Sequence, residues 1–469
     1  MLWQPPGATR PGESVTFGGM IVCKFGGTSV QDASAILRLA TIVAARQHEQ
    51  PVVVVSALPR VTDSLVSLAD SVRQGHAAAV EATLETLHDR HRAVAGTLKG
   101  GEAALPALDA GFAELRRVLR PAVGRVLTPA ERDLLLGQGE LWSSHLVEAA
   151  LNNTGIPVAW VDARQVIVTD DRHGRATPLL DAIRTAAQRV IAPLLAAGRI
   201  PLTQGFIGAT AEGRPTVLGR GGSDFTASLL GAALDALRVE IWTDVNGLMT
   251  ADPRIVPEAR TLASATYDEA AELATFGAKV LHPATQLPLA AAGIPIVILN
   301  AQHPDNPGTI IGLTRASALR ADGPIGSISW KPGAILLNVR APRMLGAYGF
   351  LRQLFEVFER HEVPVDVLAS SEVSVSLTVE DASRLNALVR DLTPLGEVTV
   401  SEGRAIVAVV GHGMLSSPGI AARVFAAVQP ANIEVISQGA SATNLTFVVK
   451  EADGPAIVQR LHREFFGGN

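Results

Sequence analysis

The feature that most constrains the fold is a short apolar run, Met20–Cys23, that leads directly into Lys24-Phe-Gly-Gly-Thr-Ser. Such a run suits one buried strand, and paired glycines let the backbone approach a ligand because they carry no Cβ and accept either sign of φ. A helix starting near Asp32 would add its unpaired amides, and Lys24 adds a full charge. The motif therefore predicts a phosphate-binding strand-to-helix turn, with an ordinary turn and a solvated lysine as the alternative.

The following segments alternate between helical and strand patterns. Apolar residues recur at helical spacing from Ala35 to Val43, and Pro51–Val55 is typical of a buried parallel strand. Ser56 follows that strand and Thr62 opens the next helical segment, so both hydroxyls are expected where open α/β sheets bind ligands; helix capping is the alternative. The alternation predicts an α/β fold whose open, mostly parallel sheet has helices on both faces.

Composition excludes several classes of protein. The 469 residues are 47% hydrophobic and 18% charged, with a formal net charge of −5, which gives no electrostatic case for nucleic acid. The apolar runs have strand length, so we expect no membrane partner. The first nineteen residues lack the apolar core of a secretory signal, and the single cysteine, Cys23, excludes an intrachain disulfide. These features predict a cytoplasmic protein.

Two further motifs place a charge beside glycines. Glu140 follows Gly139 in an otherwise apolar helical segment, and a buried carboxylate requires a cationic partner. Arg220 precedes Gly-Gly-Ser-Asp and offers a planar guanidinium suited to a carboxylate or a phosphate. Ser223 and Asp224 are expected to cap the apolar helix over 227–237 or to bind an anion at its start. Neither a P-loop nor a full dinucleotide-binding pattern occurs.

The region after the predicted strand Val239–Val245 contains two acids, Asp244 and Asp252. They suit Mg²⁺ as oxygen ligands, but two acids alone favour a structural role in the loop. Lys279 lies in a second glycine-bearing apolar setting. Histidine and cysteine form no cluster in the sequence, so we predict no metal site built by the protein itself.

The last third of the chain contains an internal repeat. Gly349–Phe358 and Gly419–Val428 match at an offset of 70 residues, and apolar positions stay paired through Val379 and Val449. Each unit has the pattern of a ferredoxin-like β-α-β-β-α-β plait. Two small plaits in tandem favour a sensor over a catalytic domain.

Four motifs together closely resemble the aspartate kinases of the amino acid kinase superfamily. They are Lys24–Ser29, Gly219–Asp224, Trp242–Val245 and Phe276–Pro283. The similarity runs from about Met20 to the C-terminus and is greatest to the monofunctional, lysine-sensitive type. It implies an amino acid kinase fold followed by two ferredoxin-like ACT domains. It also implies ATP- and Mg²⁺-dependent phosphorylation of the L-aspartate β-carboxylate to 4-phospho-L-aspartate, the first step towards lysine, threonine and methionine.

The resemblance implies roles for matched positions. Lys24 and the Gly26-Gly27 pair would bind the transferring phosphate, with Asp224 orienting Lys24. The positions that would bind L-aspartate are Ser56, Thr62, Glu140 (for the ammonium), Arg220 (for the α-carboxylate) and Ser223. The positions that would bind ATP are Lys24, Gly26, Gly27, Thr243, Asp244, Met249, Arg254 and Lys279. Met249 departs from the tyrosine of well-known relatives. The chemistry agrees, because a carboxylate nucleophile needs no general base and the reaction can rest on positioning and charge.

The resemblance also implies regulation. L-lysine is the favoured effector, with threonine or no regulation left open, and ACT domains of this family bind effectors between protomers, which predicts a homodimer or larger assembly. The implied effector positions are Met344, Gly349, Phe350, Leu351, Asp366, Ser370, Ser371 and Glu372. The predicted domains are a disordered extension over 1–19, a catalytic domain over 20–315, a first ACT domain over 333–400, and a second made of 324–332 with 401–469.

Two other functions are kept as alternatives. Another carboxylate or carbamate kinase of the superfamily would retain the glycine motifs but not Glu140, Arg220 and the paired plaits together. A non-catalytic amino-acid sensor would retain the repeat while losing Lys24 or Asp224.

Overall fold

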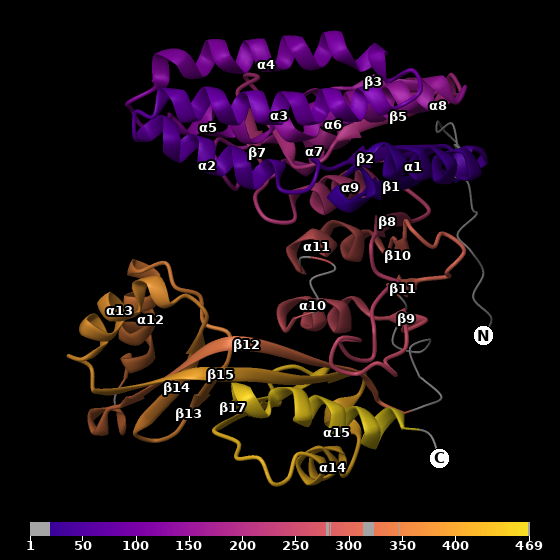
Figure 1. Ribbon diagram of the computed structural model, residues 1–469. Helices are drawn as coiled ribbons and strands as arrows, with labels where there is room; N and C mark the ends of the chain where they lie inside the picture. Colours follow the sequence, from indigo (N-terminus) through magenta and orange to yellow (C-terminus); the bar gives the residue numbers. More distant parts are fainter. Residues whose placement is uncertain (1–18, 278–280, 282, 313–322, 347, 468–469) are drawn as a thin grey trace.

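The computed structural model describes residues 19–277, 281, 283–312, 323–346 and 348–467. Of the extension predicted over residues 1–19, residues 1–18 lie outside the described residues. An eight-stranded sheet forms the first part of the chain, and its pairings are parallel except that of β10 with β11 (Figure 1). Its strands, in order across the sheet, are β3 (Val158–Val161), β5 (Ile200–Gln204), β2 (Pro51–Val55), β1 (Ile21–Phe25), β8 (Val239–Thr243), β10 (Ile296–Asn300), β11 (Thr309–Ile311) and β9 (Ser264–Ala265). The predicted α/β class is confirmed.

Helices cover this sheet, which is why its central strands are mostly apolar, with the buried Lys24 in β1 and the buried Glu240 in β8 as exceptions. Every residue of β1 and β2 is buried. One group of helices packs around α6 and another around α9, both against the sheet. Their bounds are α1 (Ala33–Arg46), α6 (Gln138–Asn153), α7 (Leu180–Val190), α8 (Ala192–Ala196), α9 (Gly222–Ala233), α10 (Tyr267–Thr275) and α11 (Pro283–Ala292).

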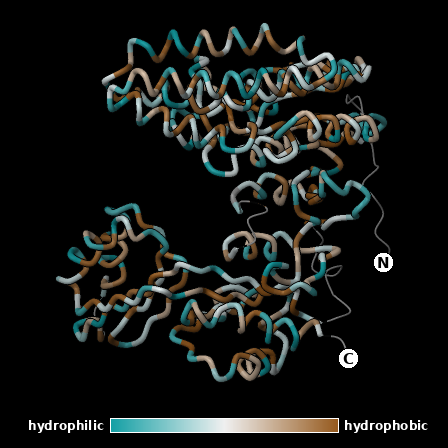
Figure 2. The backbone as a smooth tube through the Cα atoms, in the orientation of Figure 1, coloured by the Kyte–Doolittle hydropathy of each residue, from teal (hydrophilic) through white to brown (hydrophobic). Residues whose placement is uncertain are grey.

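A second layer of helices extends beyond the sheet, and much of it comes from residues 76–132, whose Ala- and Leu-rich pattern predicts helices (Figure 1). It consists of α2 (Val61–Arg73), α3 (Ala77–Thr97), α4 (Leu105–Leu119) and α5 (Pro129–Leu136). In Figure 2 the outer helix α4 alternates between apolar and polar colours. Its buried residues, Leu108, Phe112, Leu115 and Leu119, recur at helical spacing, so α4 packs one face inward.

Two predicted elements are divided in the structure. The sequence over 182–197 predicts one helix, but the chain forms α7 and α8 with a break just before Pro193, because proline cannot donate the backbone bond of a helix interior. The sequence over 200–207 predicts one strand, but the chain turns at Phe206, whose φ is +70°. The chain then enters a small three-stranded sheet made of β4 (Val168–Thr169), β6 (Ile207–Thr210) and β7 (Pro215–Val217).

The last third forms one six-stranded sheet. Its strands, in order, are β13 (Leu368–Ser370), β14 (Ser374–Val379), β12 (Ile325–Arg340), β15 (Glu397–Gly411), β17 (Asn444–Lys450) and β16 (Val435–Gln438). The two long strands β12 and β15 pair along their whole lengths, from Ile325 opposite Gly411 to Arg340 opposite Glu397. The segment expected to supply an extra strand, Ile325–Trp330, is the first part of β12. The two repeat units therefore share continuous strands.

The repeat reappears in the helices of this sheet, which are α12 (Phe350–Arg360), α13 (Leu385–Leu392), α14 (Ile420–Ala427) and α15 (Gly454–Phe466). Gly349 and Gly419 precede α12 and α14 with φ values of +81° and +78°. A left-handed residue is needed at both equivalent turns, and glycine adopts it without strain. Among the described residues, no helix is both long enough and apolar enough to span a bilayer.

Candidate active site

Lys24 and Asp224 meet where β1 and α9 face each other. Lys24 Nζ lies 2.5 Å from Asp224 Oδ1, and the two side chains are 10% and 14% exposed. The contact is an ion pair whose angles differ from those of a hydrogen bond. The expectation that Ser223 and Asp224 cap a helix starting near 227 is wrong: α9 already begins at Gly222, and its N-cap is Gly221 with φ +72°. Asp224 therefore lies inside the first turn and faces Lys24.

Glu140 is held in the first turn of α6 with almost no exposure. The Ala57 amide donates to its carboxylate, but Oε2 has no hydrogen-bond partner among the described residues. Burial raises the pKa of Glu140 to about 8, against the opposing effects of backbone donors and the Lys24 charge. A buried carboxylate with an unused oxygen is suited to bind a cationic ligand group.

The predicted substrate positions line one cleft of about 450 Å³. Arg220 enters it from the turn between Gly219 and Gly221, both of which have positive φ. An anion-binding arginine and a buried glutamate thus line the same small space as the Lys24–Asp224 pair. The site residues predicted from the sequence that line this cleft are Lys24, Ser56, Thr62, Glu140, Arg220, Ser223 and Asp224.

The glycine pair after β1 is not required for backbone conformation, and only Gly27 lies where a Cβ would be crowded. Gly26 has φ −71°, and Gly27 is absent from the positive-φ residues of the described chain. A Cβ on Gly27 would lie 3.0 Å from the Ala57 carbonyl oxygen, and one on Gly26 would lie 3.7 Å from Lys24 Nζ. The expected use of either sign of φ is therefore wrong for these two glycines, and the close approach of their backbone to a ligand stays a prediction.

A larger groove of about 1060 Å³ adjoins the cleft and shares Arg220, Gly221 and Asp224 with it. Arg254 lines this groove from the loop after β8 and forms an ion pair with Asp252 at 2.6 Å. The opposite wall is contributed by β12, through the segment from Trp330 to Gly333. The two cavities thus meet at Asp224.

The remaining predicted nucleotide positions lie near the end of β8 or on the loop that follows it. Thr243 ends the strand, and its hydroxyl donates to Asp244 at 3.1 Å. Met249 forms a backbone bridge with Thr261, whose hydroxyl lies 3.6 Å from the methionine sulfur. Lys279 lies outside the described residues.

The predicted effector positions belong to two neighbouring segments of the first repeat unit. Met344, Gly349, Phe350 and Leu351 surround the start of α12, while Ser370, Ser371 and Glu372 form the turn between β13 and β14. The Ala341 amide donates to the Val373 carbonyl and ties these segments together. Phe350 is buried in the core of this unit, so only its backbone is available to a ligand.

Asp366 is a predicted effector position whose two carboxylate oxygens have different surroundings. Lys331 Nζ lies 3.3 Å from its Oδ1 and also forms an ion pair with Glu380. The second oxygen, Oδ2, is buried and has no hydrogen-bond partner in the described part of the chain. Asp366 is thus half satisfied by a lysine of the protein itself.

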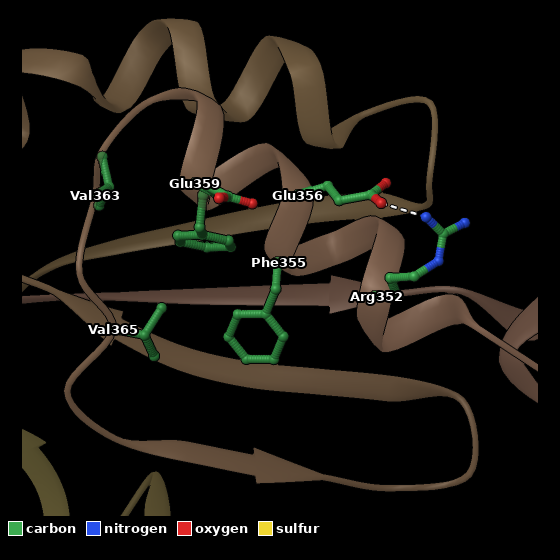
Figure 3. A pocket seen from close by; sticks show the side chains of 7 residues that line it. Arg352, Phe355, Glu356, Glu359, Val363 and Val365 are labelled. Carbon is green, nitrogen blue, oxygen red and sulfur yellow. Dashed lines mark hydrogen bonds and ion pairs between the residues drawn. The ribbon is translucent and has the colours of Figure 1, made fainter.

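A separate hollow of about 600 Å³ lies against α12 (Figure 3). Phe355 and Val365 point towards it, and Arg352 pairs with Glu356 at its edge. None of the eight predicted effector positions, all of which the structure describes, lines this hollow.

Among the residues that were not predicted to belong to the site are one that lines the cleft and one that lies behind it. Phe206 lines the cleft from the strained turn after β5, and its amide donates to Thr226 Oγ1 at 3.1 Å. Asp133 is buried behind the Arg220 turn, where it accepts hydrogen bonds from His173 and from the amides of Gly174 and Val217. The position of Phe206 at a strand end was a usable signal; Asp133 carried none.

Comparisons with known proteins agree with this geometry. Residues 19–300 match the model of the amino acid kinase family, and residues 407–465 match an ACT domain. The chain is 38% identical over 462 residues to lysine-sensitive aspartokinase 3 of Escherichia coli (strain K12), covering 95% of this chain and 99% of that protein. A crystal structure of E. coli aspartokinase III with aspartate and ADP in the R-state superposes with a TM-score of 0.83 at 36% identity, covering 95% of this chain and 100% of that one. The T-state structure with lysine and aspartate gives 0.82 at the same identity and covers 95% and 99%.

Proposed function

Because the chain belongs to the aspartokinase family, it is an ATP-dependent aspartate kinase, and we propose that the 450 Å³ cleft holds L-aspartate while the adjoining groove holds the nucleotide. The resemblance to aspartate kinases and the predicted enzyme class are confirmed. The observation that carries the site assignment is the meeting of the two cavities at the Lys24–Asp224 pair.

Glu140 and Arg220 recognise the two ends of the amino acid. The α-ammonium pairs with Glu140, one of whose oxygens has no hydrogen-bond partner among the described residues, and the α-carboxylate pairs with the Arg220 guanidinium. Ser56, Thr62 and Ser223 supply hydroxyl groups along the same cleft. The β-carboxylate is then left facing Lys24.

The reaction needs positioning more than proton transfer. The β-carboxylate is already a nucleophile at neutral pH, so its oxygen attacks the γ-phosphorus directly while the bond from that phosphorus to the bridging β-phosphate oxygen breaks and ADP leaves. Lys24 offsets the negative charge of the transferring phosphoryl group, and the backbone at Gly26-Gly27 admits it closely. Asp224 holds Lys24 in the line between the two substrates.

The nucleotide lies along the groove beside Arg254. Thr243, Asp244 and Met249 do not line this groove and, like Lys279, are assigned to the nucleotide from the family match. Among the described residues, no group of three or more His, Cys, Asp or Glu side chains could hold a metal ion. We assign Mg²⁺ to the phosphates of ATP, where it neutralises their charge.

The regulatory part follows the family pattern. We assign L-lysine to the eight effector positions and a homodimer or larger assembly to the ACT units, in keeping with the lysine-bound E. coli relative. The domain division into 20–315, 333–400, and 324–332 with 401–469 stays a proposal. The pairing of Ile325–Trp330 with the end of β15 supports it.

The substitution Lys24→Ala tests the site. In an assay for acyl phosphate and ADP with both substrates present, the variant should lose activity by about a thousandfold or more, since it removes the charge at the transferring group. Lys99→Ala, on an exposed turn, is the matched control and should keep its rate. Near-normal turnover by a folded Lys24→Ala protein would contradict the assignment. Titrating lysine, threonine and methionine in the same assay identifies the effector.

A further inference from the structure

The loop between β8 and β9 starts in the catalytic part and enters the core of the second repeat unit. At its base, the Leu248 amide donates to Thr309 Oγ1 at 2.9 Å, and Leu262 donates back to the Leu248 carbonyl at 2.8 Å. Further along, Ala251 and Val256 are buried among the apolar residues of β12, β15, β17, α14 and α15. The loop is thus built partly on the regulatory sheet.

Thr250 connects this loop to the regulatory sheet, because its amide, carbonyl and hydroxyl groups all form hydrogen bonds. Its amide donates to the Arg260 carbonyl and its hydroxyl oxygen accepts from the Arg260 amide, both at 2.9 Å, which closes the loop on itself. Its carbonyl accepts from the Ile328 amide of β12 at 2.8 Å. The same hydroxyl shares a 2.9 Å hydrogen bond with His462 Nε2 of α15. Thr250 and His462 are both almost fully buried.

Three flanking bonds fasten the loop to the same regulatory elements. The Ser327 hydroxyl donates to the Met249 carbonyl at 2.7 Å. Gln459 of α15 donates to the Ile255 carbonyl at 2.9 Å, and the Arg260 guanidinium donates to the Phe466 carbonyl at 3.1 Å. The segment from Met249 to Arg260 is therefore held at both ends and in the middle by β12 and α15.

This segment carries Asp252 and Arg254, which line the groove that adjoins Asp224. The following inference rests on the proposed nucleotide site. We infer that Thr250 and His462 are positioning residues for ATP, because their hydrogen bond fixes the loop that presents Arg254 to the groove. The C-terminal helix thereby sets nucleotide affinity from a position 212 residues away in the sequence.

The test compares Thr250→Val with Thr250→Ser in the full-length enzyme. Valine keeps the volume and removes the hydroxyl, whereas serine keeps it. Thr250→Val should raise the KM for ATP roughly twentyfold, the scale of the two hydrogen bonds that its hydroxyl makes with the Arg260 amide and His462, while the KM for aspartate and kcat stay within about twofold. Thr250→Ser should restore the KM for ATP. Binding of ADP alone, measured by calorimetry, should weaken in parallel.

A matched control lies in β17, where Thr446 is buried and its hydroxyl has no hydrogen-bond partner among the described residues. Thr446→Val should leave both KM values unchanged. If Thr250→Val does not fold, His462→Met against His462→Gln makes the same comparison from the other side of the bond, because the glutamine amide can reach Thr250.

The outcomes separate this inference from the function it rests on. A wild-type enzyme without ATP- and aspartate-dependent acyl phosphate formation would overturn the proposed function. An active wild type whose Thr250→Val and His462→Met variants keep a normal KM for ATP would overturn the positioning role alone. Equal rises in both KM values, or a lower melting temperature with unchanged kinetics, would likewise show a purely structural bond.

Discussion

Two glutamates in the catalytic part are equally well buried but differ in the hydrogen-bond partners of their carboxylates. Glu240, in the middle of β8, is 1% exposed, and its carboxylate accepts hydrogen bonds from Arg46, Arg238 and Trp242. Glu140 is 4% exposed, and one of its oxygens has no partner among the described residues. Since an unpaired buried carboxylate is costly, the first region is complete as it stands and the second is incomplete without a ligand.

The difference shows how to separate structural from functional buried charge. The Glu240 network is closed, because Arg238 also pairs with Glu49 at 2.7 Å and each cation is shared between acids. The Glu140 carboxyl borders a cleft that also contains Arg220 and Lys24. Burial alone would have treated the two glutamates alike, whereas the account of their hydrogen bonds distinguishes them.

The largest expected effect on stability is that of Glu240→Gln. The substitution removes the negative charge that two arginines share, so we expect the free energy of unfolding to fall by about 3 kcal/mol, measured by urea denaturation. Glu114→Gln is the control, because Glu114 pairs with Arg117 on an exposed helix face. Its denaturation midpoint should match that of the wild type. Equal midpoints for all three proteins would mean that the Glu240 network stabilises nothing.

Glu140→Gln should have the opposite profile. Losing the partner of the substrate ammonium should raise the KM for aspartate about a hundredfold, with the KM for ATP little changed. Stability should not fall. The folded pKa near 8 exceeds the ordinary value of 4.5, so the folded state holds a proton that the unfolded state releases, and Glu140 lowers stability as pH rises from 4.5 to 8. The variant should therefore equal or exceed the wild type in denaturation at pH 8. A destabilised variant with normal aspartate kinetics would mean that Glu140, like Glu240, has a structural role.

The sequence was sufficient to identify side chains that stand next to glycine. Arg220 and Glu140 adjoin a glycine and Lys24 lies two residues before Gly26, and a charge close to bare backbone is a local signal for a ligand site. The parallel sheet and the tandem repeat were likewise readable, since both depend on local periodicity.

The remaining parts depend on contacts between distant segments. Phe206 has a φ of +70° and packs against Gly222, where a Cβ would lie 3.0 Å from Phe206 Cα. Because α9 starts at Gly222 rather than near 227, its first residue is the one that lies against Phe206. No local pattern links Thr250 to His462 either, because the two are 212 residues apart in the sequence. Such features follow only from the assembled fold.

The pH dependence of substrate binding sharpens the comparison further. Aspartate binds as an ammonium, so its pairing requires Glu140 to lose the proton that it keeps below a pKa of about 8. The KM for aspartate should fall about tenfold for each unit of pH between 6 and 8 and level off above 8. Glu140→Gln should be flat over this range when measured at constant ionic strength. A wild-type profile without this slope would mean that Glu140 is ionised before the substrate arrives.

The smallest expected effect concerns Asp366. Its carboxylate is intermediate between those of Glu240 and Glu140, because one oxygen pairs with Lys331 and the other has no hydrogen-bond partner among the described residues. An effector ammonium can use the free oxygen, so Asp366→Asn should raise the lysine concentration for half-inhibition about tenfold, relative to the variant's own uninhibited rate. Glu380→Gln removes the other acid at Lys331 and is the control, because Glu380 is half exposed. If both substitutions shift inhibition equally, the effect passes through Lys331 and not through direct contact with the effector. A shift confined to Asp366→Asn means that the half-satisfied carboxylate, like Glu140, is completed by its ligand.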